Sequence, residues 1–162
     1  MRALNLAALL AFATDQLSKY VVIVRMDLRS VGGIDVLPPF LGFRYGENPG
    51  INFGLFANGS TAASWALIAV ALVICAGVWR WLHQPQMGAL ARISGGLLIG
   101  GALANVLDRL LYGFVLDFLN TSCCGIDNPF VFNLADVWIF AGALGLVFFA
   151  AEGKTTPGQK GQ

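Results

Sequence analysis

Four long apolar segments limit the folds open to this chain. They cover residues 4–24, 61–82, 90–111 and 132–151. Each is about 20 residues long, and at about 1.5 Å per residue a helix of that length spans roughly the 30 Å hydrocarbon core of a bilayer. The pattern predicts an all-α membrane protein with four transmembrane helices.

The composition agrees with lipid as the solvent of this chain. Hydrophobic residues make up 57% of the sequence and charged residues 12%, about half the charge that a soluble domain carries. So apolar a chain does not remain a solvated coil, and a net charge of +1 excludes a basic surface for nucleic acid. We expect a single membrane-embedded domain over residues 1–151 and a disordered cytoplasmic tail over residues 152–162.

The basic residues predict the orientation in the membrane, because cytoplasmic loops are enriched in Lys and Arg. With both termini in the cytoplasm, the inner side holds Arg2, Arg80, Arg92, Lys154 and Lys160. The outer segment after the first span then holds Arg25, Arg29 and Arg44. A cleavable secretory signal ending near residues 11–13 is the alternative, but the apolar run continues to residue 24 and favours a retained helix.

The segment between the first two spans, residues 25–60, is rich in Gly, Pro and aromatic residues. It is too apolar for a loose linker and predicts a small extracytoplasmic β-rich layer lying on the membrane face. Residues 48–50 (Asn-Pro-Gly) predict a turn. Because the inner loop near His83 is brief, we expect the function to lie on the outer face.

Two copies of one local pattern carry the candidate chemistry. Asn105 and Asp108 lie three residues apart in the third span, and Asn133 and Asp136 repeat this spacing at the start of the fourth. The spacing puts each pair on one helix face, and antiparallel spans put both carboxylates roughly 6 Å below the outer boundary. Two carboxylates at one depth predict an aspartic dyad that shares a proton, with one acting as base and the other as acid.

The structural alternative is that Asp108 pairs with Arg109 and that Asp136 only caps the fourth helix. The matched repetition of the pattern favours catalysis over this alternative. Other catalytic sites lack their parts on the outer face, because the single histidine, His83, lies on the inner side. We therefore expect no metal and no cofactor.

Other residues of interest have simpler interpretations. Lys19 is the only lysine within a span, and its neighbour Ser18 lies on a different helix face, although Ser64 and Ser94 stay open as partners for a Ser–Lys nucleophile. The glycine pairs at residues 95–96 and 100–101 predict close helix packing. The redox state of the adjacent Cys123 and Cys124 stays open.

Two rival functions come from other classes. A small proton-coupled carrier or channel subunit also uses membrane carboxylates, but it needs polar groups through the full thickness of the bilayer. Apart from Asp15, expected at mid-membrane, the acids of the spans cluster in the outer third. A structural four-helix assembly factor would leave Asp108 and Asp136 dispensable.

Five sequence blocks occur in an order that closely resembles the lipoprotein signal peptidases, the type II signal peptidases of bacteria. They are residues 15–19, 48–54, 101–109, 113–118 and 132–136. Together they cover essentially the whole chain except the polar tail. The resemblance differs at one position, where this chain has Ala104 before Asn105 and the family pattern usually has Gly.

The resemblance implies an intramembrane aspartic endopeptidase of the bacterial inner membrane, with its active site at the periplasmic side. It would cleave diacylglyceryl-modified prolipoproteins just before the lipidated cysteine, acting as a monomer among membrane lipids. Matched by motif, Asp108 and Asp136 resemble the catalytic pair. The residues matching substrate-binding and supporting positions are Asn48, Gly50, Asn105, Arg109, Asn133, Asp15 and Lys19.

Overall fold

A computed structural model describes residues 1–50, 61–123 and 128–150. In chain order the elements are α1 (Arg2–Lys19), η1 (Tyr20–Arg25), α2 (Leu28–Val31), β1 (Gly33–Leu37), β2 (Leu41–Asn48), α3 (Thr61–Leu82), α4 (Ala89–Tyr112), β3 (Val115–Thr121) and α5 (Leu134–Phe149). The predicted tail, residues 51–54 of the second motif block and Cys124 lie outside the described residues.

Three of the four predicted spans have membrane-spanning length. They are Arg2–Arg25, in which η1 continues α1 as a π-helix, Thr61–Leu82 and Ala89–Tyr112. The fourth predicted span, residues 132–151, contains the 16-residue helix α5, which gives about 24 Å. It is apolar but shorter than the other three, because its chain is extended up to residue 133.

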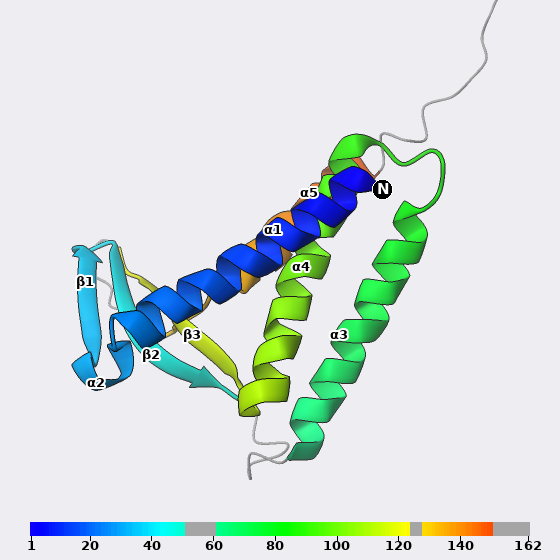
Figure 1. Ribbon diagram of the computed structural model, residues 1–162. Coiled ribbons are helices and arrows are strands. Elements are labelled where there is room, and N and C mark those ends of the chain that lie inside the picture. The colour runs from blue at the N-terminus through cyan, green and yellow to red at the C-terminus, as the bar shows by residue number, and fades with distance from the viewer. Residues whose placement is uncertain (51–60, 124–127, 151–162) are drawn as a thin grey trace, which may run out of the picture.

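Helix α4 is the centre of the bundle, with α1 and α5 packed closely against it and α3 beside it (Figure 1). Its glycines permit this packing. A Cβ on Gly100 would lie 2.2 Å from the Ala8 carbonyl oxygen of α1, and one on Gly101 would lie 2.5 Å from the Ala135 carbonyl oxygen of α5. The prediction of close packing at the glycine pairs is confirmed, because any side chain here would push the helix backbones apart.

The small β-rich layer is a three-stranded antiparallel sheet in the order β1-β2-β3. The sequence placed this layer in the first outer segment alone, and that expectation is incomplete. The third strand, β3, comes from the connection between α4 and α5. One face of the sheet packs on the end of the first span through a core of Val22, Ile23, Leu28 and Phe118.

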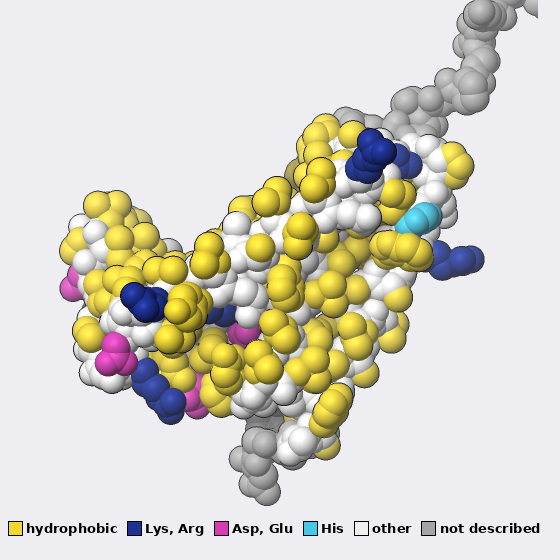
Figure 2. All heavy atoms as spheres, in the orientation of Figure 1, with side chains coloured by type: hydrophobic (Ala, Val, Ile, Leu, Met, Phe, Trp, Pro, Cys, Tyr) yellow, Lys and Arg dark blue, Asp and Glu magenta, His cyan; other side chains and the backbone are white. Residues whose placement is uncertain are grey.

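The sheet lies at one end of the helices, where α1 and α4 end and α5 begins (Figure 1). The N-terminus and the α3–α4 connection lie together at the opposite end. Apolar side chains cover the helices between these ends, and charged side chains gather near the ends (Figure 2). This is the distribution expected of helices that face lipid along their length.

Candidate active site

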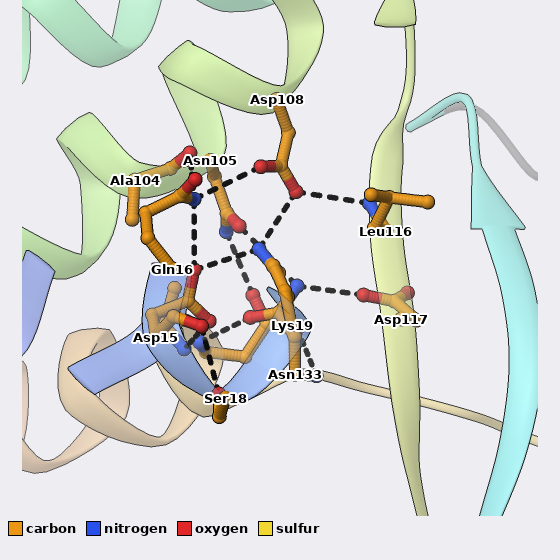
Figure 3. A network of polar contacts seen from close by, with 12 residues as sticks. Asp15, Gln16, Ser18, Lys19, Ala104, Asn105, Asp108, Leu116, Asp117 and Asn133 are labelled. Carbon is orange, nitrogen blue, oxygen red and sulfur yellow. Dashed lines mark hydrogen bonds and ion pairs between the residues drawn. The ribbon is translucent and has the colours of Figure 1, made fainter. Parts of the chain in front are cut away.

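A buried ion triad lies where the helices meet the sheet (Figure 3). The ammonium of Lys19, the last residue of α1, lies 2.7 Å from a carboxylate oxygen of Asp15 and 2.7 Å from one of Asp108. The amide of Gln16 donates to both carboxylates, at 3.2 Å to Asp15 and 3.0 Å to Asp108. All three charges are almost fully buried, so each depends on the others for its solvation.

The two carboxylates of this triad each hold a backbone amide of a neighbouring element. Asp108 accepts a hydrogen bond from the Leu116 N–H of β3 at 3.0 Å. Asp15 accepts one from the Ala135 N–H of α5 at 2.8 Å. Leu116 and Ala135 immediately precede two further aspartates, Asp117 and Asp136. The two carboxylates that are paired with Lys19 therefore fix the backbone just before each of these aspartates.

The Asp136 carboxylate is held at the first turn of α5. Asn133 is the N-cap of this helix, and its side-chain oxygen accepts from the Asp136 N–H at 2.9 Å. The carboxylate returns the bond by accepting from the Asn133 N–H at 3.4 Å, which completes a capping box. Asn105 of α4 donates to the other carboxylate oxygen at 2.9 Å. Asp136 remains partly exposed.

Asp117 on β3 points toward the same group of side chains (Figure 3). Its two carboxylate oxygens accept from Asn133 Nδ2 at 2.6 Å and from Asn48 Nδ2 at 3.1 Å. The pKa of Asp117 is raised from its ordinary value of 3.8 to about 6, chiefly by burial and then by the negative charge of Asp136. Asn133 thus binds both Asp117 and Asp136, and the two carboxylates are electrostatically coupled.

The predicted turn at residues 48–50 lies beside Asp117, because Asn48 is hydrogen-bonded to the carboxylate of Asp117. Gly50 donates its N–H to the Asn48 side-chain oxygen at 2.9 Å, which forms an Asx turn. Gly50 has a φ of +85°, and a Cβ there would lie 2.4 Å from Leu67 of α3 and 3.1 Å from the Arg109 guanidinium. Only glycine fits both this backbone conformation and this space.

Arg109 extends from the last turn of α4 toward these carboxylates. Its Nη1 donates to the Asn105 carbonyl oxygen at 3.3 Å. Its charge interacts, in order of strength, with Asp136, Asp108 and Asp117. Arg109 therefore supplies positive charge to a site that holds three acidic groups.

The structure brings every predicted site residue into one connected region, but it pairs the carboxylates differently from the sequence expectation. The ion pair of Asp108 is with Lys19, and within the described residues no hydrogen bond joins Asp108 to Asp136. The structural alternative is only partly right, because Asp136 takes part in the capping box of α5 but Asn133 is the N-cap, and among the described residues the ion pair of Asp108 is with Lys19 and not with Arg109. Asp15, expected at mid-membrane, lies instead beside the first turn of α5.

Asp117 is not among the site residues predicted from sequence, although it lies in one of the resembling blocks, residues 113–118. A signal was present, because Asp117 stands between apolar residues in Val115-Leu116-Asp117-Phe118. A buried acid in a strand needs partners that only the fold supplies. Cys123 is disulfide-bonded, and it lies outside this group of residues.

Helices that face lipid, with carboxylates gathered at one end of the bundle, fit the class of membrane proteases. Comparison with known proteins agrees with this class. The family model described as signal peptidase (SPase) II matches residues 7–151. This chain belongs to the signal peptidase II family.

Curated relatives show the same relationship over most of their length. The lipoprotein signal peptidase of Alteromonas mediterranea is 40% identical over 139 residues, which cover 85% of this chain and 74% of the relative. That of Symbiobacterium thermophilum is 37% identical over 142 residues, which cover 87% and 88%. That of Sphingopyxis alaskensis is 37% identical over 141 residues, which cover 86% and 80%.

Two solved structures, described as bacterial membrane enzymes determined by the in meso method, share the fold. One has a TM-score of 0.74 and 26% identity and covers 97% of this chain and 92% of its own. The other has a TM-score of 0.75 and 27% identity and covers 93% and 92%.

Proposed function

We propose that this protein is the protease that removes signal peptides from prolipoproteins in the bacterial inner membrane, and that it acts through a pair of aspartates. The observation that carries this proposal is the coupled pair of carboxylates at the sheet end of a membrane-embedded bundle, in a chain of the signal peptidase II family. The carrier alternative is not favoured, because Asp15, Asp108, Asp117 and Asp136 all gather at one end of the helices.

The catalytic pair that the geometry favours is Asp117 with Asp136, in place of the Asp108–Asp136 pair expected from sequence. A general acid or base must exchange its proton with substrate and water. Asp108 is fully buried, and both of its oxygens are bound by Lys19, Gln16 and the Leu116 amide. Asp117 is also buried, but its side chain lines an open hollow, its oxygens accept from the amides of Asn133 and Asn48 in place of an ammonium, and it interacts with the charge of Asp136.

The mechanism follows from this coupling. Because the pKa of Asp117 is raised to about 6, we assign it the shared proton at the start of the reaction. The ionised Asp136 takes a proton from a water molecule, whose oxygen attacks the scissile carbonyl carbon. Asp117 donates its proton to the carbonyl oxygen, which gives a neutral gem-diol. The proton on Asp136 then passes to the leaving amine as the C–N bond breaks, and Asp117 takes back the proton of one diol hydroxyl as the new carbonyl forms.

The neighbouring amides and Arg109 complete the site. Asn133, Asn48 and Asn105 donate hydrogen bonds to the two carboxylates and so fix their orientation. Arg109 is positively charged and interacts with Asp136, Asp108 and Asp117, so it lowers the electrostatic cost of holding the third carboxylate, Asp108, close to the catalytic pair. The ion triad centred on Lys19 holds the backbone before each catalytic aspartate, so it acts as a positioning device and not as a reactant.

We propose that α5, with its flanking residues, is the fourth span, that both termini are cytoplasmic and that the sheet faces the periplasm. The common end occupied by the N-terminus and the α3–α4 connection supports this arrangement. We propose also that the protein works as a monomer among lipids. Transfer of the acyl chains of a diacylglyceryl cysteine into the bilayer contributes about 0.8 kcal/mol per methylene. This anchoring holds the scissile bond at a fixed depth beside the two catalytic aspartates.

The test is cleavage of a synthetic diacylglyceryl prolipoprotein peptide by purified protein in detergent. We expect Asp117→Asn and Asp136→Asn to abolish cleavage while the fold is kept, because an amide cannot transfer the proton. Asp27→Asn is the matched control, since Asp27 is exposed and its left-handed φ of 49° suits Asn. The same peptide with a free thiol is expected to be cleaved little or not at all.

Asp108→Asn separates the two assignments of the pair. We expect this variant to unfold at lower temperature but to retain measurable cleavage once folded, because its carboxylate only supports Lys19 and the strand. Loss of all cleavage in a well-folded Asp108→Asn, together with activity in Asp117→Asn, would restore the pairing of Asp108 with Asp136.

A further inference from the structure

The sheet carries a second, larger hollow next to the one that borders Asp117. It has a volume of about 590 Å³ and is lined mainly by the β1–β2 turn, β2 and the segment after β3, with Asp35 of β1 and Asn120 of β3 also in its walls. The smaller hollow at Asp117 has a volume of about 210 Å³. Pro129 and Val131 line both, so the two hollows adjoin, and together they are called the groove here.

The groove follows strand β2 along the face of the sheet that carries the polar side chains. Leu41, Gly42 and Arg44 line its far part, and Gly46, Glu47 and Asn48 line the part next to Asp117. The eight residues of β2 extend over roughly 26 Å at about 3.3 Å each. This length matches an extended peptide of several residues that starts beside the catalytic pair.

The segment after β3, residues 128–131, forms one wall of the groove and is held in place before any substrate binds. Asn120 of β3 donates to the carbonyl oxygens of Asn128 at 2.7 Å and Phe130 at 2.8 Å. The Asn128 amide donates to the Thr121 carbonyl oxygen at 3.1 Å, and the Ser122 hydroxyl accepts from the Asn128 N–H at 3.2 Å. These bonds tie the wall to the sheet, as expected of a pre-formed binding site.

The chemistry of the walls identifies the occupant. Charged and amide side chains alternate with proline, leucine and valine, which suits a peptide backbone with mixed side chains and does not suit an acyl chain. The groove runs from Asp117 along the sheet and away from the helices, whereas a signal peptide lies among the helices in the lipid. The part of a substrate that follows the scissile bond is therefore the part that reaches it.

We propose that this groove binds the first residues of the mature lipoprotein, those after the lipidated cysteine, in an extended conformation. The inference rests on the proposed function and assigns a substrate-binding role to Gly42, Arg44 and Asn120, which take no part in the chemistry. Gly42 lies beneath the guanidinium of Arg44, whose Nη1 would be 3.1 Å from a Cβ at this position, so a large side chain here displaces Arg44 and enters the groove.

The experiment compares two diacylglyceryl peptides with the same signal sequence, one ending two residues after the cysteine and one continuing for eight. We expect the unmodified protein to show a KM for the long peptide that is about five- to tenfold lower, the scale of one or two net hydrogen bonds. Gly42→Phe fills the groove and should raise the KM for the long peptide to that of the short one, with kcat unchanged.

The matched control is Gly77→Phe, which adds the same ring on an exposed face of α3 where no atom lies within 4 Å. It should leave both KM values unchanged. Equal KM values for the two peptides with the unmodified protein would overturn the proposal that the groove binds the mature segment. Equal effects of Gly42→Phe on both peptides would overturn it too. In either case, cleavage of the short peptide would still support the proposed function. Failure to cleave either peptide would instead count against the proposed function.

A second measurement applies if Gly42→Phe does not fold. A photoreactive residue is placed five positions after the cysteine and cross-linked to Asp136→Asn, which binds substrate without cleaving it. We expect the cross-link on residues 41–44 or 120–122. A cross-link confined to the helices, or to a lipid, would overturn the proposal.

Discussion

Asp117→Asn should change the pH dependence of stability in a predictable way. The raised pKa of Asp117, about 6 against an ordinary value of 3.8, means that the folded state holds this proton more tightly than the unfolded state. The contribution of Asp117 to stability is therefore fully present below pH 3.8 and is lost as the pH rises through about 6. Asn does not titrate, so the variant escapes this loss.

The magnitude follows from the pKa. At about 1.4 kcal/mol for each pKa unit, most of a loss of about 3 kcal/mol falls between about pH 4 and pH 8. The variant also loses one of the hydrogen bonds from Asn133 and Asn48, which costs about 1–3 kcal/mol at any pH. The pH-dependent part is therefore the informative quantity, because the constant part cancels when the two pH values are compared.

The assay is chemical unfolding in detergent at several pH values, with Asp27→Asn as the control. We expect the free energy of unfolding of Asp117→Asn, relative to the unmodified protein, to rise by about 2–3 kcal/mol between about pH 4 and pH 8. The control should show no comparable rise. A difference that stays flat over this range would refute the raised pKa and with it the assignment of the proton to Asp117.

Three further expectations test the supporting structure. Lys19→Met leaves Asp15 and Asp108 buried without their cation, so thermal unfolding should show a loss of about 3–5 kcal/mol, and a near-normal stability would contradict the triad. Gly50→Ala would place a Cβ 2.4 Å from Leu67 at a position of positive φ. We therefore expect cleavage to fall at least about tenfold while circular dichroism shows the helices intact, and unchanged turnover would argue against a tight turn. A cysteine placed at His83 should be protected from a membrane-impermeant reagent in intact cells while one at Asp27 is labelled, and the reverse pattern would invert the topology.

Much of the fold was readable from sequence because lipid imposes a simple rule. Backbone groups in a bilayer must bond within a helix, so apolar runs of sufficient length mark the spans. Residues 61–82 match α3, and residues 90–111 match α4 to within one residue at each end. The glycines at 96 and 100 were also readable as packing positions, because side-chain size acts locally.

The limits of the sequence appear where residues act across elements. The predicted fourth span, residues 132–151, contains a helix of only 16 residues, which starts after its N-cap Asn133. Strand β3 was not expected, because its pairing with β2 joins residues about 70 positions apart in sequence. Local pattern carries no information on which distant strand will supply such a partner.

The sequence by itself determined a membrane protease with acids near one face, and it listed nearly all the residues of the site. Only the tertiary structure decided which acids are coupled. Asp108 and Asp136 share a motif, but Lys19 forms an ion pair with Asp108, whereas β3 carries Asp117 to Asn133 and into the electrostatic field of Asp136. The physical reason is that the proton affinity of a carboxylate depends on burial and on charges a few ångströms away, and these are set by packing between elements distant in sequence.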